Sequence, residues 1–158
     1  MSGFVRVPPD FLRSIATGPQ DGEPGGVENT PVLYFHPNPV LRAFFWLRLE
    51  WIHALIRRHV GASGSACDFG GGGGVLLPTL AAQFDRVVCI DRKLDEAREV
   101  VAHYGLDNVE LALEDIATSG RDERFDCIVA ADVLEHFPEL DIPIAALVRW
   151  LRPGGWLF

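Results

Sequence analysis

The sequence has little of what marks disulfide-bonded or zinc-binding proteins. It contains only three cysteines, Cys67, Cys89 and Cys127, which lie in separate apolar segments without a Cys-x-x-Cys pair. An odd number of cysteines in that arrangement favours buried core thiols over a disulfide framework or a structural zinc site. Unpaired thiols of this kind are typical of a reducing compartment. We therefore expect a cytoplasmic protein without a bound metal.

Long hydrophobic runs and an excess of basic residues are also missing. No run approaches the roughly 18 apolar residues of a membrane-spanning helix, and the N-terminal stretch MSGFVRVPPDFLRS lacks the apolar core of a signal peptide. The formal net charge is −8, which argues against a partner held through its phosphate groups. We therefore expect no transmembrane segment and no nucleic-acid partner.

The composition predicts one globular domain preceded by a polar N-terminal segment. The chain has 158 residues, of which 48% are hydrophobic, enough for a single domain with a real core. Residues 1–30 are rich in glycine, proline and aspartate, and they predict a flexible N-terminal arm. Residues 31–61 predict a helical segment, and residues 62–158 carry the main domain.

A long helix is predicted from Pro39 to Val60. Asn38 suits the N-cap, proline suits the first helical position, and Gly61 ends the helix. Apolar residues recur at helical spacing and define one face: Leu41, Phe44, Phe45, Ile52 and Leu55. Arg48 falls in the middle of that face, where a charge needs either a partner or a route to solvent.

Strand-like and helix-like segments alternate through the rest of the chain. The expected strands are SACDF, RVVCID, NVELAL and FDCIVAAD, and the expected helices are VLLPTLAAQF, LDEAREVVAHYG and IPIAALVRWL. RPGG then predicts a turn, and WLF begins a fifth strand. Such alternation predicts an α/β fold whose parallel strands are joined by right-handed crossovers.

The most informative segment is the glycine-rich loop from Asp68 to Gly74. It directly follows a strand and precedes a helix, so glycines there let the backbone approach a ligand closely. A phosphate-binding P-loop is excluded because no lysine lies near it. The dinucleotide pattern Gly-x-Gly-x-x-Gly fits in no register. The pattern that fits is acid-x-Gly-x-Gly-x-Gly, on Asp68, Gly70, Gly72 and Gly74.

This pattern resembles the first motif of class I S-adenosylmethionine-dependent methyltransferases, and further motifs follow in the family's order. They are VVCID before residue 92, Glu114-Asp115-Ile116, the segment ADVLEH at 131–136, and LRPGGWL at 151–157. The resemblance covers about Tyr34 to Phe158. The segment from Pro39 onward is also weakly similar to ubiquinone-type O-methyltransferases.

The resemblance implies an S-adenosylmethionine site on a doubly wound, Rossmann-like sheet. Asp68 would suit the cofactor's ammonium group, Asp91 its ribose hydroxyls, and Glu114 or Asp115 its adenine amino group, with Asp115 favoured. The methionine carboxylate is a candidate partner for Arg48. The cofactor-binding residues implied are Asp68, Gly70, Gly72, Gly74, Asp91, Arg92, Asp115, Ile116, Ala131 and Arg48.

The predicted activity is methyl transfer to a small-molecule acceptor, by O- or C-methylation. His136 is the titratable candidate for a catalytic base near the cofactor, although a helix-capping role is the alternative. A metal bound by Asp132, Glu135 and His136 is conceivable, but capping and hydrogen-bonding roles are favoured. A non-catalytic module that binds cofactor or a protein partner is the alternative function, and a nicotinamide oxidoreductase is disfavoured by the glycine spacing.

The family's sheet has seven strands, whereas this sequence supplies four and the start of a fifth at Trp156-Leu157-Phe158. The expected fold is therefore an incomplete sheet, truncated at its C-terminal end. We expect a fragment of a longer protein that associates through the open sheet edge and lacks part of the acceptor pocket.

Overall fold

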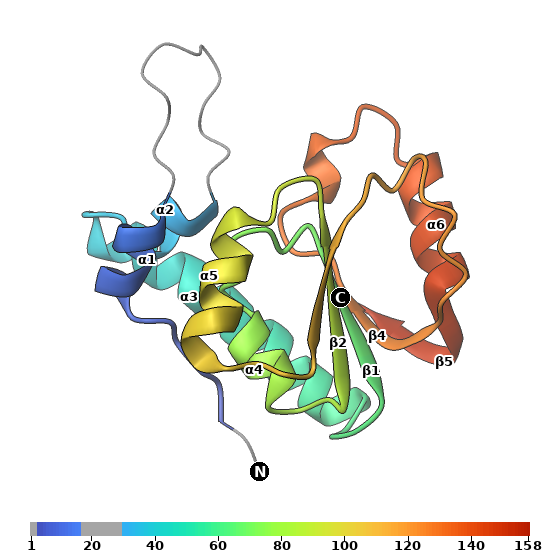
Figure 1. Cartoon of the computed structure of the whole chain (residues 1–158), viewed down its shortest axis with the longest axis horizontal. Coiled ribbons are helices and arrows are strands. Elements are labelled where there is room, and N and C mark those ends of the chain that lie inside the picture. Colours follow the sequence, from blue (N-terminus) through green and yellow to red (C-terminus); the bar gives the residue numbers. More distant parts are fainter. Residues whose placement is uncertain (1–2, 17–29) are drawn as a thin grey trace.

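A computed structural model of the chain describes residues 3–16 and 30–158 (Figure 1). Its centre is a parallel sheet with the strand order β3-β2-β1-β4-β5. The strands are β1 (Ser65–Phe69), β2 (Arg86–Asp91), β3 (Val109–Leu113), β4 (Phe125–Val129) and β5 (Leu151–Leu157). The chain reverses its direction of winding between β1 and β4, which is where open α/β sheets bind ligands. The prediction of a doubly wound α/β sheet preceded by a helix is confirmed.

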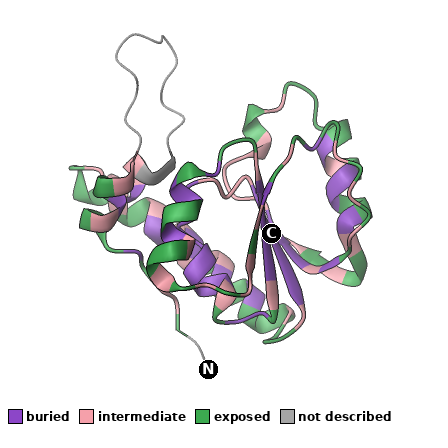
Figure 2. Cartoon of the chain, viewed as in Figure 1, coloured by how far each residue is buried: buried purple, intermediate pink, exposed green. Residues whose placement is uncertain are grey.

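Helices cover both faces of the sheet, and this explains why the central strands are buried along most of their length (Figure 2). One face packs against α3 (Pro39–His59), α4 (Leu77–Ala81) and α5 (Asp95–Tyr104). The other face packs against α6 (Asp141–Trp150), whose Trp150 is fully buried. No helix in residues 3–16 and 30–158 is both long and apolar enough to cross a bilayer.

The three cysteines lie in this buried sheet, as predicted. They belong to the neighbouring strands β1, β2 and β4, all three are fully buried, and none forms a disulfide. Cys89 and Cys127 face the layer of α3, α4 and α5, whereas Cys67 faces α6. They act as small core residues on both sides of the sheet.

Helix α3 begins as the sequence predicts but docks through a different face. The Asn38 side chain accepts hydrogen bonds from the amides of Val40 and Leu41 at 2.9 and 3.4 Å. The buried residues are Trp46, Leu49, His53 and Ile56. The predicted apolar face is therefore wrong in part, since Phe44 is 59% exposed and Leu55 is 40% exposed.

The reason is that α3 is apolar on most of its circumference, so spacing alone does not select the face that docks. Opposite the buried face runs a second apolar stripe that is exposed to solvent. Its members are Val40, Phe44, Leu47, Trp51 and Leu55.

The N-terminal segment differs from the flexible arm expected over residues 1–30. Residues 9–15 form α1 (Pro9–Ile15), and both Val7 and Leu12 are fully buried. The Val5 amide donates a hydrogen bond to Thr79 Oγ1 at 3.0 Å, which attaches the segment to α4. Val7 and Leu12 pack against the layer of α3, α4 and α5, although the segment around them is rich in proline. Residues 17–29 lie outside the described residues, and α2 (Thr30–Tyr34) follows them.

The turn predicted at residues 152–155 lies inside β5 as a bulge. Phe125 pairs with Leu151, and the next pair joins Cys127 to Trp156, so the residues between them bulge out of the ladder. Gly154 has φ +83° there. Strand β5 is one of the two edges of the sheet in the described chain, the other being β3, and association through the β5 edge stays a prediction.

Candidate functional site

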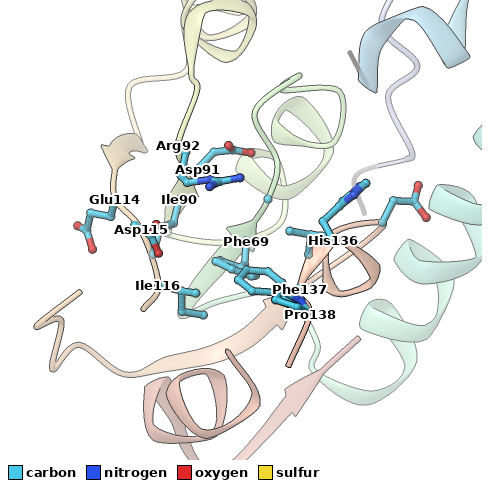
Figure 3. Close-up of a pocket in the computed structure, with 13 residues that line it drawn as sticks. Phe69, Ile90, Asp91, Arg92, Glu114, Asp115, Ile116, His136, Phe137 and Pro138 are labelled. Atoms are coloured by element: carbon cyan, nitrogen blue, oxygen red, sulfur yellow. The ribbon is translucent and has the colours of Figure 1, made fainter. Parts of the chain in front are cut away.

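A cleft of about 270 Å³ opens at the carboxyl ends of the strands (Figure 3). Its walls come from the end of β1, the end of β2, the segment after β3 and the segment after β4. The lining residues are Phe69, Gly70, Ile90, Asp91, Arg92, Glu114, Asp115, Ile116, Asp132, Val133, His136, Phe137 and Pro138. This is the position at which a doubly wound sheet holds a ligand.

The predicted site residues divide into two groups. Gly70, Asp91, Arg92, Asp115, Ile116 and His136 line the cleft. Asp68, Gly72, Gly74, Ala131 and Arg48 do not. Sequence reasoning missed the apolar walls formed by Phe69, Ile90, Val133, Phe137 and Pro138. The sequence could have indicated these residues, because they directly neighbour the motif residues in the chain. A flat ligand needs apolar contacts as well as polar ones.

The glycine spacing has a structural cause in the packing of the loop against α5. A Cβ on Gly72 would lie 2.5 Å from the Lys93 carbonyl oxygen. A Cβ on Gly74 would lie 2.8 Å from Ala97 Cα, and Gly74 also has φ +68°. Both positions therefore exclude side chains, and the loop lies flat between β1 and α5.

Asp68 lies behind this loop with only 4% of its surface exposed. Burial, together with the smaller effect of the negative charge of Asp91, raises the pKa of its carboxyl to about 7. The structure records no hydrogen bond or ion pair to this carboxylate from any described residue. A buried carboxylate without such a partner would be stabilised by a cationic group bound next to it.

Asp91 connects the end of β2 to the glycine loop. One carboxylate oxygen accepts a hydrogen bond from the Gly72 amide at 2.9 Å, and the other accepts one from the Lys93 amide at 3.1 Å. The carboxylate is held in one orientation at the cleft wall, and each oxygen has a further lone pair for a ligand hydroxyl.

The structure separates the roles of the two acids that follow β3. The Glu114 carboxylate accepts hydrogen bonds from Arg121 at 2.5 Å and from the Ser119 hydroxyl at 2.7 Å. The Arg121 guanidinium lowers the pKa of Glu114. Asp115 is exposed, and its one recorded side-chain bond is to the Ala117 amide at 2.9 Å. Asp115 is therefore the acid with capacity for a ligand, while Glu114 is occupied.

Arg48 has a partner that the sequence argument did not identify. Its guanidinium forms a bidentate ion pair with Asp132, which follows β4 and lines the cleft. The guanidinium carbon also lies 4.7 Å from the centre of the Phe45 ring. Asp132 has φ +53°, a strained value for a residue with a side chain. The pair joins α3 to the cleft wall, and a contact of Arg48 with the ligand stays a prediction.

His136 ends a short 3-10 helix, η1 (Leu134–His136), at the cleft. In the described ranges, no group of three or more His, Cys, Asp or Glu side chains is arranged to hold a metal ion. Asp132, which the sequence offered as one ligand, is instead paired with Arg48. The arrangement of the cleft suits a nucleoside-like ligand with a cationic group.

Comparisons with known proteins identify the family of the chain. A family model described as "Methyltransferase domain" matches residues 67–158. A ubiquinone biosynthesis O-methyltransferase from Aromatoleum aromaticum is 34% identical over 71% of this chain and 48% of its own length. One from Chromobacterium violaceum is 30% identical over 71% of this chain and 49% of its own length.

Solved structures give the same fold. The N-methyltransferase NodS from Bradyrhizobium japonicum, in complex with S-adenosyl-L-homocysteine, superposes with a TM-score of 0.64 at 21% identity. That match covers 94% of this chain and 69% of NodS. The structure named as the DhpI-SAM-HEP complex gives a TM-score of 0.60 at 25% identity over 78% of this chain and 55% of DhpI. The chain spans about half the length of the curated relatives it matches.

Proposed function

Because this chain belongs to the methyltransferase domain family, we propose that it is the cofactor-binding part of an S-adenosylmethionine-dependent methyltransferase. The observation that carries the proposal is the convergence of Gly70, Asp91, Asp115 and Ile116 on one cleft at the strand ends. These residues come from three separate sequence motifs, and the fold brings them together. S-adenosylmethionine is the cofactor that class I methyltransferases use.

The residues of the cleft fit this cofactor. Asp91, whose carboxylate is held by the Gly72 and Lys93 amides, would accept hydrogen bonds from the two ribose hydroxyls. Asp115 would accept one from the adenine amino group, and Ile116, a lining residue that is 4% exposed, would pack against the ring. The buried Asp68 carboxylate would compensate the cationic ammonium group. Gly70, directly after β1, lines the cleft, and a Cβ at this position would clash with Val133, another lining residue.

The chemistry that the bound cofactor supplies is an electrophilic methyl group on a sulfonium. The protein's part is mainly to position two reactants and to exclude water. His136 lies at the cleft and is the candidate base that takes the proton from an acceptor hydroxyl. We propose a small-molecule acceptor and O-methylation, supported by relatives that are named as ubiquinone biosynthesis O-methyltransferases.

Calorimetry on the purified chain tests the proposal. S-adenosylhomocysteine should bind with a dissociation constant in the micromolar range, and NAD+ at the same concentrations should give no heat of binding. Because the two ligands share an adenosine, the comparison tests the end of the site that is formed by the glycine loop and Asp68. Binding of NAD+ but not of S-adenosylhomocysteine would refute the proposal and favour an oxidoreductase.

A further inference from the structure

The connection from β3 to β4 is the crossover of this sheet that has no helix. Residues 114–124 form a turn and irregular chain, although they connect the edge strand β3 to the interior strand β4. Their first residues, Glu114, Asp115 and Ile116, form a wall of the cleft. Something other than a helix must therefore hold this wall in place.

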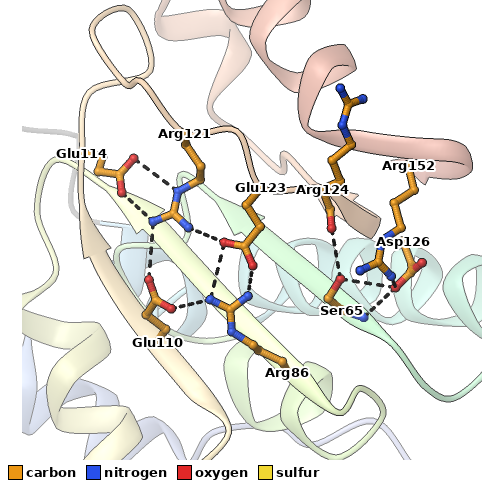
Figure 4. Close-up of polar contacts among 9 residues, drawn as sticks. All are labelled: Ser65, Arg86, Glu110, Glu114, Arg121, Glu123, Arg124, Asp126 and Arg152. Carbon is orange, nitrogen blue, oxygen red and sulfur yellow. Dashed lines mark hydrogen bonds and ion pairs between the residues drawn. The ribbon is translucent and has the colours of Figure 1, made fainter.

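That role falls to a cluster of charged side chains, which we call the Arg121 network (Figure 4). It consists of Arg86, Glu110, Glu114, Arg121 and Glu123. Arg121 is the central member and is only 13% exposed. Its guanidinium contacts Glu114 at 2.5 Å, Glu123 at 2.6 Å and Glu110 at 3.4 Å. Arg86 contacts Glu110 and Glu123 but not Glu114.

The backbone of Arg121 is fixed independently of its side chain. Its carbonyl accepts a hydrogen bond from Trp150 Nε1 at 3.0 Å, and its amide donates one to Ser119 Oγ at 3.2 Å. Because Trp150 is fully buried in α6, the guanidinium extends from a rigid point. The ion pair and hydrogen bond to Glu114 raise the pKa of Arg121, so the guanidinium keeps its charge.

Glu114 is held from two sides. Its amide donates to the Asp91 carbonyl at 3.1 Å, while its carboxylate is held by Arg121 and Ser119. Without Arg121, the Glu114 carboxylate would lose its strongest partner, and the wall formed by residues 114–116 would lose the contact that keeps Asp115 in position. The network thus fixes which of two adjacent acids is offered to a ligand and where that acid lies.

We propose that Arg121 is a positioning residue that sets the base selectivity of the cleft. By holding Glu114 away, it leaves Asp115 as the acceptor for the exocyclic amino group of adenine. This inference rests on the proposed function. It assigns a role to a residue outside the cleft lining and outside the motifs of the sequence.

The test compares two ligands that differ at one edge of the base, where an oxo group replaces the amino group and N1 carries a hydrogen. Calorimetry measures binding of S-adenosylhomocysteine and of S-inosylhomocysteine, which carries an oxo group instead. The parent should prefer the adenine compound by about tenfold or more, the effect of one hydrogen bond to a charged group. Arg121→Gln should bring this ratio close to one, and Arg121→Lys, which keeps the charge, should restore part of it.

Arg86→Gln is the matched control, because it removes an arginine of the same network that does not touch Glu114. It should lower the melting temperature without changing the ratio. A ratio that Arg121→Gln leaves at the parent value would overturn the inference, since a purely structural role weakens both ligands equally. If Arg121→Gln does not fold, Arg121→Lys with an unchanged ratio overturns it in the same way.

Two further outcomes separate this inference from the proposed function. A parent that binds both compounds equally would overturn the role of Asp115 and Arg121 but leave the methyltransferase proposal intact. A parent that binds neither compound would refute the proposed function itself. Asp115→Asn should abolish the preference in the parent and have no further effect on the ratio in Arg121→Gln.

Discussion

Replacing Asp68 with asparagine should stabilise the ligand-free protein, by an amount that grows with pH. Burial raises the pKa of this carboxyl from 3.8 to about 7. In the pH range between these values the folded protein keeps a proton that the unfolded chain has released. Stability is therefore lost as the pH rises from about 4 to about 7, and the loss is complete above that range. Asparagine has nearly the same shape and no charge, so it removes this dependence.

The magnitude follows from the shift. A difference of about three pKa units corresponds to about 4 kcal/mol at pH 8, which is an upper bound for the gain from Asp68→Asn. Between pH 6 and pH 8 the same linkage amounts to about 1 kcal/mol. The second figure is the more robust, because a difference between two pH values cancels any change in packing caused by the amide.

Urea unfolding of both proteins at pH 6, 7 and 8 measures this effect. The free energy of unfolding of Asp68→Asn minus that of the parent should increase by about 1 kcal/mol across the series. Asp122→Asn, at an exposed position, is the charge-matched control. A difference that stays constant with pH would refute the assignment of a protonated Asp68 to the ligand-free state. Asp68→Asn should also bind S-adenosylhomocysteine more weakly than the parent, because it lacks the negative charge that compensates the ligand's ammonium group.

Three further changes test other parts of the site. Asp91→Ala should weaken S-adenosylhomocysteine binding by about 1.5–3 kcal/mol in calorimetry, the range for hydrogen bonds to a charged group, and unchanged affinity would remove it from the site. Arg48→Met leaves the Asp132 carboxylate without its partner and should lower the free energy of unfolding by about 1–3 kcal/mol; strict additivity with Asp132→Asn would argue against the pair. Gly74→Ala should lower the free energy of unfolding by about 2 kcal/mol or more, because the new Cβ is strained at φ +68° and clashes with Ala97. An unchanged urea midpoint would contradict that packing.

The elements that local pattern determines could be predicted from the sequence. Strands β1 and β2 have the predicted bounds, and Asn38 caps α3 as expected. The glycine loop indicated the family correctly, because its spacing reflects close backbone packing against α5 that no other residue type permits. S-adenosylmethionine is the cofactor of that family, so the prediction of the cofactor followed from the prediction of the family. These features depend on residues a few positions apart, where periodicity and turn chemistry are informative.

What could not be predicted depends on contacts between distant segments. The partner of Arg48 is 84 positions away, and Glu114 is held by Arg121, which lies in an irregular segment that gives no periodic signal. The docking face of α3 was missed because two faces of that helix are apolar. Residues 3–16 pack against the domain through Val7 and Leu12, two side chains in a segment whose composition otherwise indicates an arm.

The three buried cysteines give the sheet its own set of chemical reporters. Burial raises the pKa of Cys127 to about 12 and also raises the pKa of Cys67 and Cys89, so each thiol is inert while its surroundings stay closed. Reaction with a thiol reagent under native conditions then requires local opening of the layer that covers each residue. Cys67 reports the separation of α6, whereas Cys89 and Cys127 report that of the opposite layer. Labelling rates at the three positions would therefore resolve the opening free energies of the two faces within one molecule, without any engineered probe.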